Sequence, residues 1–74
     1  MSRPAKRSFA IKGHQTSISL EAPFWEALRE ASAELGTTPA ALVARIDAAR
    51  GATGLSSAVR VWLLAYYRSR PDRV

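Results

Sequence analysis

Polar residues at the odd positions alternate with Thr16, Ile18 and Leu20 over residues 15–21, in the stretch QTSISLE. This period of two is typical of a strand with one buried face, and it places Ile18 and Leu20 on that face. A strand needs a hydrogen-bonding partner. The preceding stretch RSFAIK also alternates, with Phe9 and Ile11 on one side, so it is one candidate for that partner.

Gly13 lies between the two alternating stretches, and two interpretations of it are open. Gly13 and His14 could form the two-residue turn of a hairpin, which would set Phe9 opposite Ile18. Alternatively, Gly13 is a bulge or kink in one longer extended arm. Because an isolated hairpin is barely stable in water, either form needs other elements to pack against.

Three helices are predicted after the strand. The first begins near Pro23, since proline suits the first turn of a helix, and ends at Gly36, a typical C-terminal stop. Thr38 is a typical N-cap for the second helix, which continues to Gly51, and the third helix covers residues 55–70. The apolar stripes expected to face the core are Phe24, Leu28, Ala31 and Leu35 in the first helix, Leu42, Val43, Ile46 and Ala49 in the second, and Leu55, Val59, Trp62 and Tyr66 in the third.

The third helix is apolar over more of its circumference than one stripe, because Val61, Leu64 and Tyr67 widen its apolar face. A helix of this kind is buried on more than one side. A chain of 74 residues has too little protein to cover such a helix, and it is marginally stable alone. We therefore expect a second copy of the chain to supply the cover.

The residue types exclude most catalytic and metal chemistry. The chain has no cysteine and one histidine, His14, which we expect in a turn. Ser56 and Ser57 have no paired base, so we expect no enzyme, no cofactor and no metal site. The longest strongly apolar stretch, residues 61–67, is far shorter than the roughly 20 residues that span a bilayer. We expect a soluble cytoplasmic protein without a membrane partner.

The formal net charge is +5 at pH 7, and it is unevenly distributed. Residues 1–20 hold four basic residues and no acidic one, whereas residues 21–36 hold four glutamates and one arginine. A basic segment beside an acidic helix favours a patch that binds a polyanion, and a solvated charged tail is the alternative. We expect residues 1–7 to form a disordered basic arm and residues 71–74 a tail. The basic residues of the first segment are Arg3, Lys6, Arg7 and Lys12.

The order of strand, helix, Gly-Thr-Thr turn and helix resembles the ribbon-helix-helix family, the fold of the Arc and methionine repressors. The chain is especially similar to short bacterial members with the pattern GHxTSxSLE…FW…LSSAxR. Here the pattern reads GHQTSISLEAPFW from Gly13 to Trp25 and LSSAVR from Leu55 to Arg60. We therefore expect residues 8–70 to form a mainly helical domain with a short β ribbon and an additional C-terminal helix.

The resemblance implies a homodimer in which the same strand of two chains pairs about a two-fold axis, and the resulting ribbon enters the major groove of DNA. Gln15, Ser17 and Ser19 would then face the base edges. Gln15 is the best candidate, since glutamine can bind an adenine edge with two hydrogen bonds. For the two serines, a solvated sheet face is the alternative. A hairpin strand beside the ribbon would obstruct its entry into the groove.

Further contacts follow from the same resemblance. Gly36, Thr37 and Thr38 match the turn whose backbone N–H groups hold a DNA phosphate, although a well-capped helix start explains them equally. Arg7 and Lys12, together with Arg3 and Lys6 of the same segment, would add phosphate contacts without sequence information. The expected dimer core consists of Ile18, Leu20, Trp25, Leu28, Leu42, Ile46 and Trp62.

Two functions are consistent with these features. The first is a transcriptional regulator that binds double-stranded DNA sequence-specifically as a homodimer, with pairs of dimers on tandem half-sites. The alternative is a protein-interaction dimer, antitoxin-like or an adaptor, that grips a protein partner through residues 55–70. The wide apolar face of the third helix favours this alternative.

Overall fold

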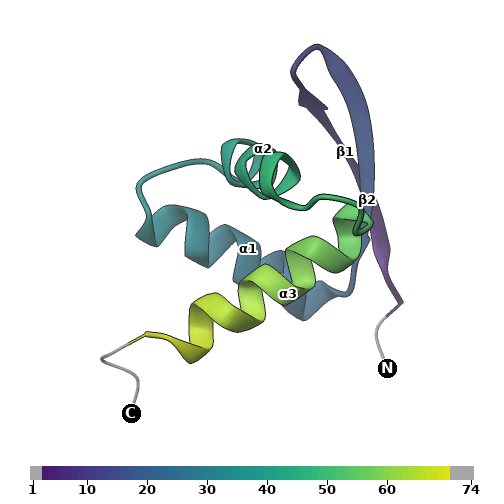
Figure 1. Ribbon diagram of the computed structural model, residues 1–74. Helices are drawn as coiled ribbons and strands as arrows, with labels where there is room; N and C mark the ends of the chain where they lie inside the picture. Colours follow the sequence, from purple (N-terminus) through teal and green to yellow (C-terminus); the bar gives the residue numbers. More distant parts are fainter. Residues whose placement is uncertain (1–2, 71–74) are drawn as a thin grey trace.

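The computed structural model describes residues 3–70 of the chain (Figure 1). Two strands, β1 (Ala5–Ile11) and β2 (His14–Leu20), form an antiparallel ribbon. Three helices follow, α1 (Ala22–Glu34), α2 (Pro39–Ala49) and α3 (Leu55–Arg68). The prediction of a mainly helical fold with a short β ribbon and an additional C-terminal helix is confirmed.

The ends of the domain differ from the expected ones. β1 begins at Ala5, so residues 5–7 of the segment expected to be a disordered arm belong to a strand. α3 ends at Arg68 rather than at residue 70. The first two residues of the expected arm and the expected tail, residues 71–74, lie outside the described part of the chain.

Lys12 and Gly13 form the turn between the two strands. Both have positive φ, 52° and 80°, which defines a type I′ turn whose twist matches that of the flanking strands. The hairpin interpretation is therefore confirmed, but its turn lies one residue earlier than the expected Gly13-His14 turn. As a result Phe9 pairs with Thr16, and the expected pairing of Phe9 with Ile18 is wrong.

The inner face of the hairpin packs on the helices. Ile11, Ile18 and Leu20 are buried there, and Phe9 is half-buried. These side chains belong to one continuous apolar core with residues of all three helices. The buried helix residues are Trp25, Leu28, Ala31, Leu42, Val43, Ile46, Leu55, Val59 and Leu63.

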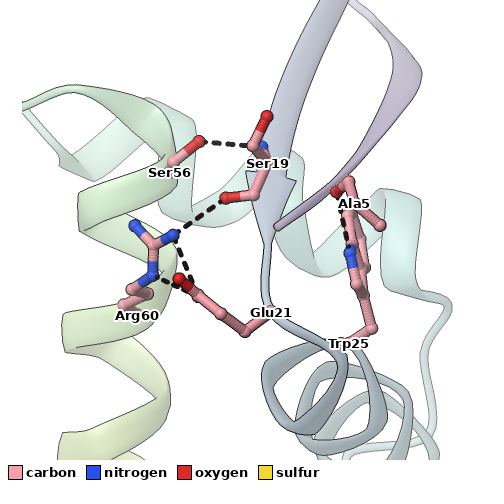
Figure 2. Close-up of polar contacts among 6 residues, drawn as sticks. All are labelled: Ala5, Ser19, Glu21, Trp25, Ser56 and Arg60. Carbon is pink, nitrogen blue, oxygen red and sulfur yellow. Dashed lines mark hydrogen bonds and ion pairs between the residues drawn. The ribbon is translucent and has the colours of Figure 1, made fainter. Parts of the chain in front are cut away.

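The buried stripe of α1 is rotated from the expected one. Trp25 is buried, whereas Phe24 is half-buried and Leu35 is 41% exposed. Contacts with β1 explain the rotation: the indole N–H of Trp25 donates to the Ala5 carbonyl oxygen at 3.0 Å (Figure 2), and the ring stacks against Phe9 at 6.0 Å. The hairpin therefore determines which face of α1 points inward.

The buried stripe of α3 also differs from the expected one. Leu55 and Val59 are buried as expected, but Leu63 completes the stripe, and Trp62 is half-buried. Val61 and Leu64 are 64% and 57% exposed. One chain therefore covers a single stripe of α3 and leaves an apolar stripe on its opposite side.

Tyr67 joins α3 to α1. Its hydroxyl donates to the Glu30 carboxylate at 3.0 Å and to the Ala27 carbonyl oxygen at 3.3 Å. Burial and the neighbouring Glu30 carboxylate raise the pKa of Tyr67 to about 12. The tyrosine thus stays neutral and keeps donating throughout the physiological pH range.

Leu63 and Leu64 provide a test of the packing of α3, because they are adjacent but only Leu63 is enclosed. Leu63→Ala should lower the free energy of unfolding by about 2–5 kcal/mol, since it leaves a cavity in the core. Leu64→Ala should cost less than about 1 kcal/mol. Urea unfolding at several protein concentrations measures both and separates folding from association. Equal losses for the two variants at low concentration would show that α3 is rotated from this packing.

Candidate nucleic-acid interface

The outer face of the hairpin is exposed and free of large apolar side chains. Cross-strand partners lie on the same face of a ribbon, so the register determines which residues lie together. Three cross-strand pairs form the outer surface of the hairpin: Lys6 with Ser19, Ser8 with Ser17, and Ala10 with Gln15. We call this surface the ribbon face. Five of its six residues are exposed, and Ser19 is half-buried.

The predicted base-edge candidates are brought together on the ribbon face. Gln15, Ser17 and Ser19 lie along β2, and the hydroxyl of Ser17 is 3.2 Å from that of Ser8. The sequence analysis placed Lys6 in a disordered arm that contacts phosphates, not on the ribbon face, and it did not consider Ser8. The alternation of β1 contained the signal, since inward Phe9 and Ile11 leave the even positions outward.

Helix α3 covers the outer edge of β2 at Ser19 (Figure 2). The Ser19 backbone N–H donates to Ser56 Oγ at 3.0 Å, and the Arg60 guanidinium donates to the Ser19 carbonyl oxygen at 3.1 Å. Arg60 also forms an ion pair with Glu21 at 3.0 Å. A backbone hydrogen bond and the Arg60 guanidinium hold the pKa of the Glu21 carboxyl below its ordinary value. These contacts fix the end of β2 against α3.

A cleft of about 520 Å³ lies between β1, α1 and the start of α2. Three arginines line it, Arg3, Arg7 and Arg29, and Glu26 is the only acidic residue among its lining residues. The Arg7 guanidinium lies 4.6 Å from the centre of the Trp25 ring, a cation–π contact that holds it at the cleft. We call this site the arginine cleft. Its geometry suits an anion such as a phosphate, which arginine binds with two parallel hydrogen bonds.

Arg29 was missed by the sequence analysis, which assigned its helix to the acidic segment. Arg7 was predicted as a phosphate contact, and the structure places it at the cleft rather than on the ribbon face. Lys12 lies at the hairpin turn, just after the end of β1, and is not among the residues that line the cleft. The two basic side chains predicted as phosphate contacts, Arg7 and Lys12, therefore lie in two separate places.

The turn before α2 uses most of its backbone donors internally. The N–H groups of Gly36 and Thr37 donate to carbonyl oxygens of α1, at 3.1 Å and 2.8 Å. Thr38 is the N-cap, as expected, and its side chain accepts from the Ala41 N–H at 3.1 Å. The N–H groups of Thr38 and Ala40 form no hydrogen bond within residues 3–70. Any phosphate at this turn would therefore meet Thr38 and Ala40 rather than the Gly36 and Thr37 amides.

The residues predicted to form a dimer core are mostly enclosed by their own chain. Six of the seven have exposed fractions of 8% or less, and Trp62 is half-buried. Trp62 stacks on Tyr66 with ring centres 5.2 Å apart. A role for these residues in a dimer stays a prediction. The six enclosed residues are Ile18, Leu20, Trp25, Leu28, Leu42 and Ile46.

The exposed stripe of α3, formed by Val61 and Leu64, has a groove on each side. Towards α1 the groove measures about 360 Å³ and includes Phe24. Towards α2 it measures about 600 Å³ and includes Trp62 and Ala49. We call this surface the α3 face. It is the apolar surface on which a partner would exclude water from Val61 and Leu64.

Other kinds of site find no support in the part of the chain that the structure describes. Within residues 3–70 there is no cluster of three or more histidine, cysteine, aspartate or glutamate side chains that could hold a metal. None of the helices described is long and apolar enough to cross a membrane.

Comparison with known proteins gives one match. A family model described as a ribbon-helix-helix domain matches residues 4–67. No curated protein and no solved structure matches the chain. The matched range includes β1 as well as β2, so the hairpin lies within the domain as the family defines it.

The Glu21 carboxylate, held by a backbone hydrogen bond and by Arg60, should make stability depend on pH. Because the pKa of Glu21 is lowered on folding, its contribution is complete above the ordinary value of 4.5 and is lost as the pH falls through the folded-state value. Glu21→Gln should remove this dependence. Thermal unfolding across the acidic range compares the two proteins, with Glu26→Gln as a control on the same helix. If the unfolding temperature of the wild type changed with pH in parallel with that of Glu21→Gln, the prediction would be contradicted.

Proposed function

Because this chain belongs to the ribbon-helix-helix domain family, whose members generally bind DNA as dimers in transcription regulators, we propose that it is a sequence-specific regulator that binds double-stranded DNA. Domains of this family are typically not enzymes. The protein acts as a homodimer in the bacterial cytoplasm, where chromosomal DNA is accessible.

The observation that carries the proposal is the ribbon face. It is an exposed, polar, two-stranded surface with no large apolar side chain, next to a cleft lined by three arginines. A two-stranded β ribbon fits the major groove, and polar side chains on it reach base edges. Arginines at the side of a ribbon meet the phosphates that border the groove.

The roles of the side chains follow from their chemistry. Gln15 binds an adenine edge with two hydrogen bonds, whereas the hydroxyls of Ser17 and Ser19 are short and accept several bases. The arginine cleft and Lys12 bind phosphates, which positions the ribbon without reading sequence. Sequence preference therefore depends mainly on Gln15, and general affinity for DNA depends on Lys12 and the arginines of the cleft.

A second copy of the chain covers the α3 face. Val61 and Leu64 are more than half exposed in one chain, which is unfavourable for two large apolar side chains on one surface. The core residues are already enclosed, and the α3 face holds two of the three exposed large apolar side chains among residues 3–70, the third being Leu35. The α3 face is therefore the apolar surface that we assign to the contact between two chains. Antiparallel contact of two α3 helices about a two-fold axis would bring Val61 of one chain against Leu64 of the other.

DNA binding should be steeply salt-dependent, and Gln15→Ala should weaken sequence discrimination more than general affinity. Fluorescence anisotropy with a duplex enriched from a random pool, and with the unselected pool, measures both at two salt concentrations. Gln15→Ala should cost about tenfold on the enriched duplex, since a bidentate pair contributes roughly 1–3 kcal/mol. It should leave binding to the pool unchanged. Equal losses on both would exclude base recognition by Gln15.

Val61→Asp should convert the dimer to a monomer, because it places a charge in the α3 face. Light scattering coupled to size exclusion gives the mass in solution. Ala33→Asp is the matched control, since Ala33 is an exposed helical residue outside both α3 grooves. A Val61→Asp protein that stays dimeric would place the dimer contact elsewhere.

A further inference from the structure

The ribbon of this protein is complete within one chain. β1 and β2 pair over seven positions, and the type I′ turn fixes their register without help from a second chain. The ribbon expected from the family resemblance takes one strand from each of two chains. The two arrangements place different residues over a DNA groove, so the difference matters for recognition.

The outer edge of β2 offers little to a second strand. Ile11 and His14 flank the turn as a hydrogen-bonded pair. Every second residue of β2 therefore bonds to β1, and the residues between them direct their backbone N–H and C=O groups to the outer edge of β2. The outward residues are Gln15, Ser17 and Ser19. Of these, Ser19 already uses both backbone groups in bonds to α3: its N–H donates to Ser56, and its carbonyl oxygen accepts from Arg60 (Figure 2). Gln15 and Ser17 remain, so a second strand could pair with only two of the three outward residues of β2.

The width of the sheet leads to the same conclusion. Neighbouring strands lie about 4.8 Å apart, so a two-stranded ribbon fits the major groove, which is about 12 Å wide. Pairing β2 with β2 of a second chain while β1 stays in place would produce four strands. Their outer strand axes would be about 14 Å apart, which is wider than the groove. The expected obstruction by a hairpin strand therefore applies to the two-chain ribbon and not to the hairpin itself.

We propose that the DNA-binding ribbon is the β1–β2 hairpin of a single chain, and that Lys6 and Ser8 of β1 contact DNA beside Gln15 and Ser17. This assignment rests on the proposed function. Lys6 is exposed and pairs with Ser19, where the ribbon approaches the helices, so its ammonium binds a phosphate at the groove wall. Ser8 lies over the groove with Ser17, whose hydroxyl it meets at 3.2 Å. A dimer then carries two complete ribbons, one for each half-site.

The first test changes Lys6 to glutamine and measures affinity for the enriched duplex over a range of salt concentrations. The slope of log affinity against log salt should become shallower by about 0.9, the value for one phosphate contact. Arg68→Gln is the matched control, because Arg68 is an exposed cation at the end of α3 away from the hairpin (Figure 1). Its line should stay parallel to that of the wild type.

The second test opens the hairpin without touching the ribbon face. Gly13 has φ +80°, which valine rarely adopts, and no heavy atom lies within 4 Å of an added Cβ, so Gly13→Val strains only the turn. Gly54→Val is the control, since Gly54 has negative φ and equally open surroundings. Gly13→Val should lose at least about tenfold in DNA affinity, and Gly54→Val should bind like the wild type. Both variants should keep their helices, which circular dichroism checks.

The outcomes separate this assignment from the proposed function. A wild-type protein that binds duplex DNA while Lys6→Gln and Gly13→Val bind it with unchanged slope and affinity would overturn the single-chain ribbon alone. Tighter binding by Gly13→Val would do the same, because it would mean that β1 obstructs a ribbon of two β2 strands. A wild-type protein that ignores duplex DNA at low salt would overturn both proposals.

Discussion

The turn at Lys12 and Gly13 is the constraint on which the rest of the structure depends. Moving a two-residue turn by one position shifts the pairing of the strands by two residues, which keeps their faces but changes which residues lie opposite each other. With this turn, Phe9 lies opposite Thr16 and Ser8 opposite Ser17. The same register sets the course of β1 over α1. The cross-strand pairs of the ribbon and the orientation of the first helix therefore follow from two residues with positive φ.

The third helix gives one chain much of what a second chain supplies in a two-chain ribbon. Ser56 and Arg60 satisfy the backbone of Ser19 at the edge of β2, and Leu63 fills the core between α1 and α2. A strand that is paired on one side and partly covered on the other no longer needs a partner strand to satisfy its hydrogen bonds. What remains uncovered is apolar side-chain surface on α3, and its burial does not require any change in the ribbon.

Much of the fold could be predicted from local patterns, because alternation and caps are local properties. Period two identified both strands, and Pro23, Gly36 and Thr38 marked helix ends where the structure has them to within a residue or two. The register could not be predicted in this way. Lysine rarely adopts positive φ, so local patterns offered no reason to prefer Lys12-Gly13 over Gly13-His14 as the turn.

The inward faces of the helices were shifted for a different reason. In α1 and α3 two large apolar residues are adjacent, Phe24 with Trp25 and Trp62 with Leu63, and the helical period alone does not decide between neighbours. Contacts with distant segments decide, as the bond from Trp25 to the Ala5 carbonyl shows. The same holds for the candidate site. Strand alternation predicts that Gln15 and its neighbours on β2 face outward. The arginine cleft could not be predicted in this way, because it exists only after β1 has packed beside α1.

The packing of α3 also explains how a chain with six acidic residues presents a basic ribbon. Three glutamates that follow the strand are turned towards α3: Glu21 binds Arg60, Glu30 accepts from Tyr67, and Glu34 pairs with Arg70 at 3.4 Å. Arginines compensate the charge of Glu21 and Glu34, and all three carboxylates are engaged on the side of α1 that faces α3. The cations of the hairpin and of the arginine cleft meet only one carboxylate, that of Glu26, among the residues that line the cleft. Charges separated in this way create a positive potential on one side of a small protein, which attracts a polyanion and orients the ribbon face towards it before contact.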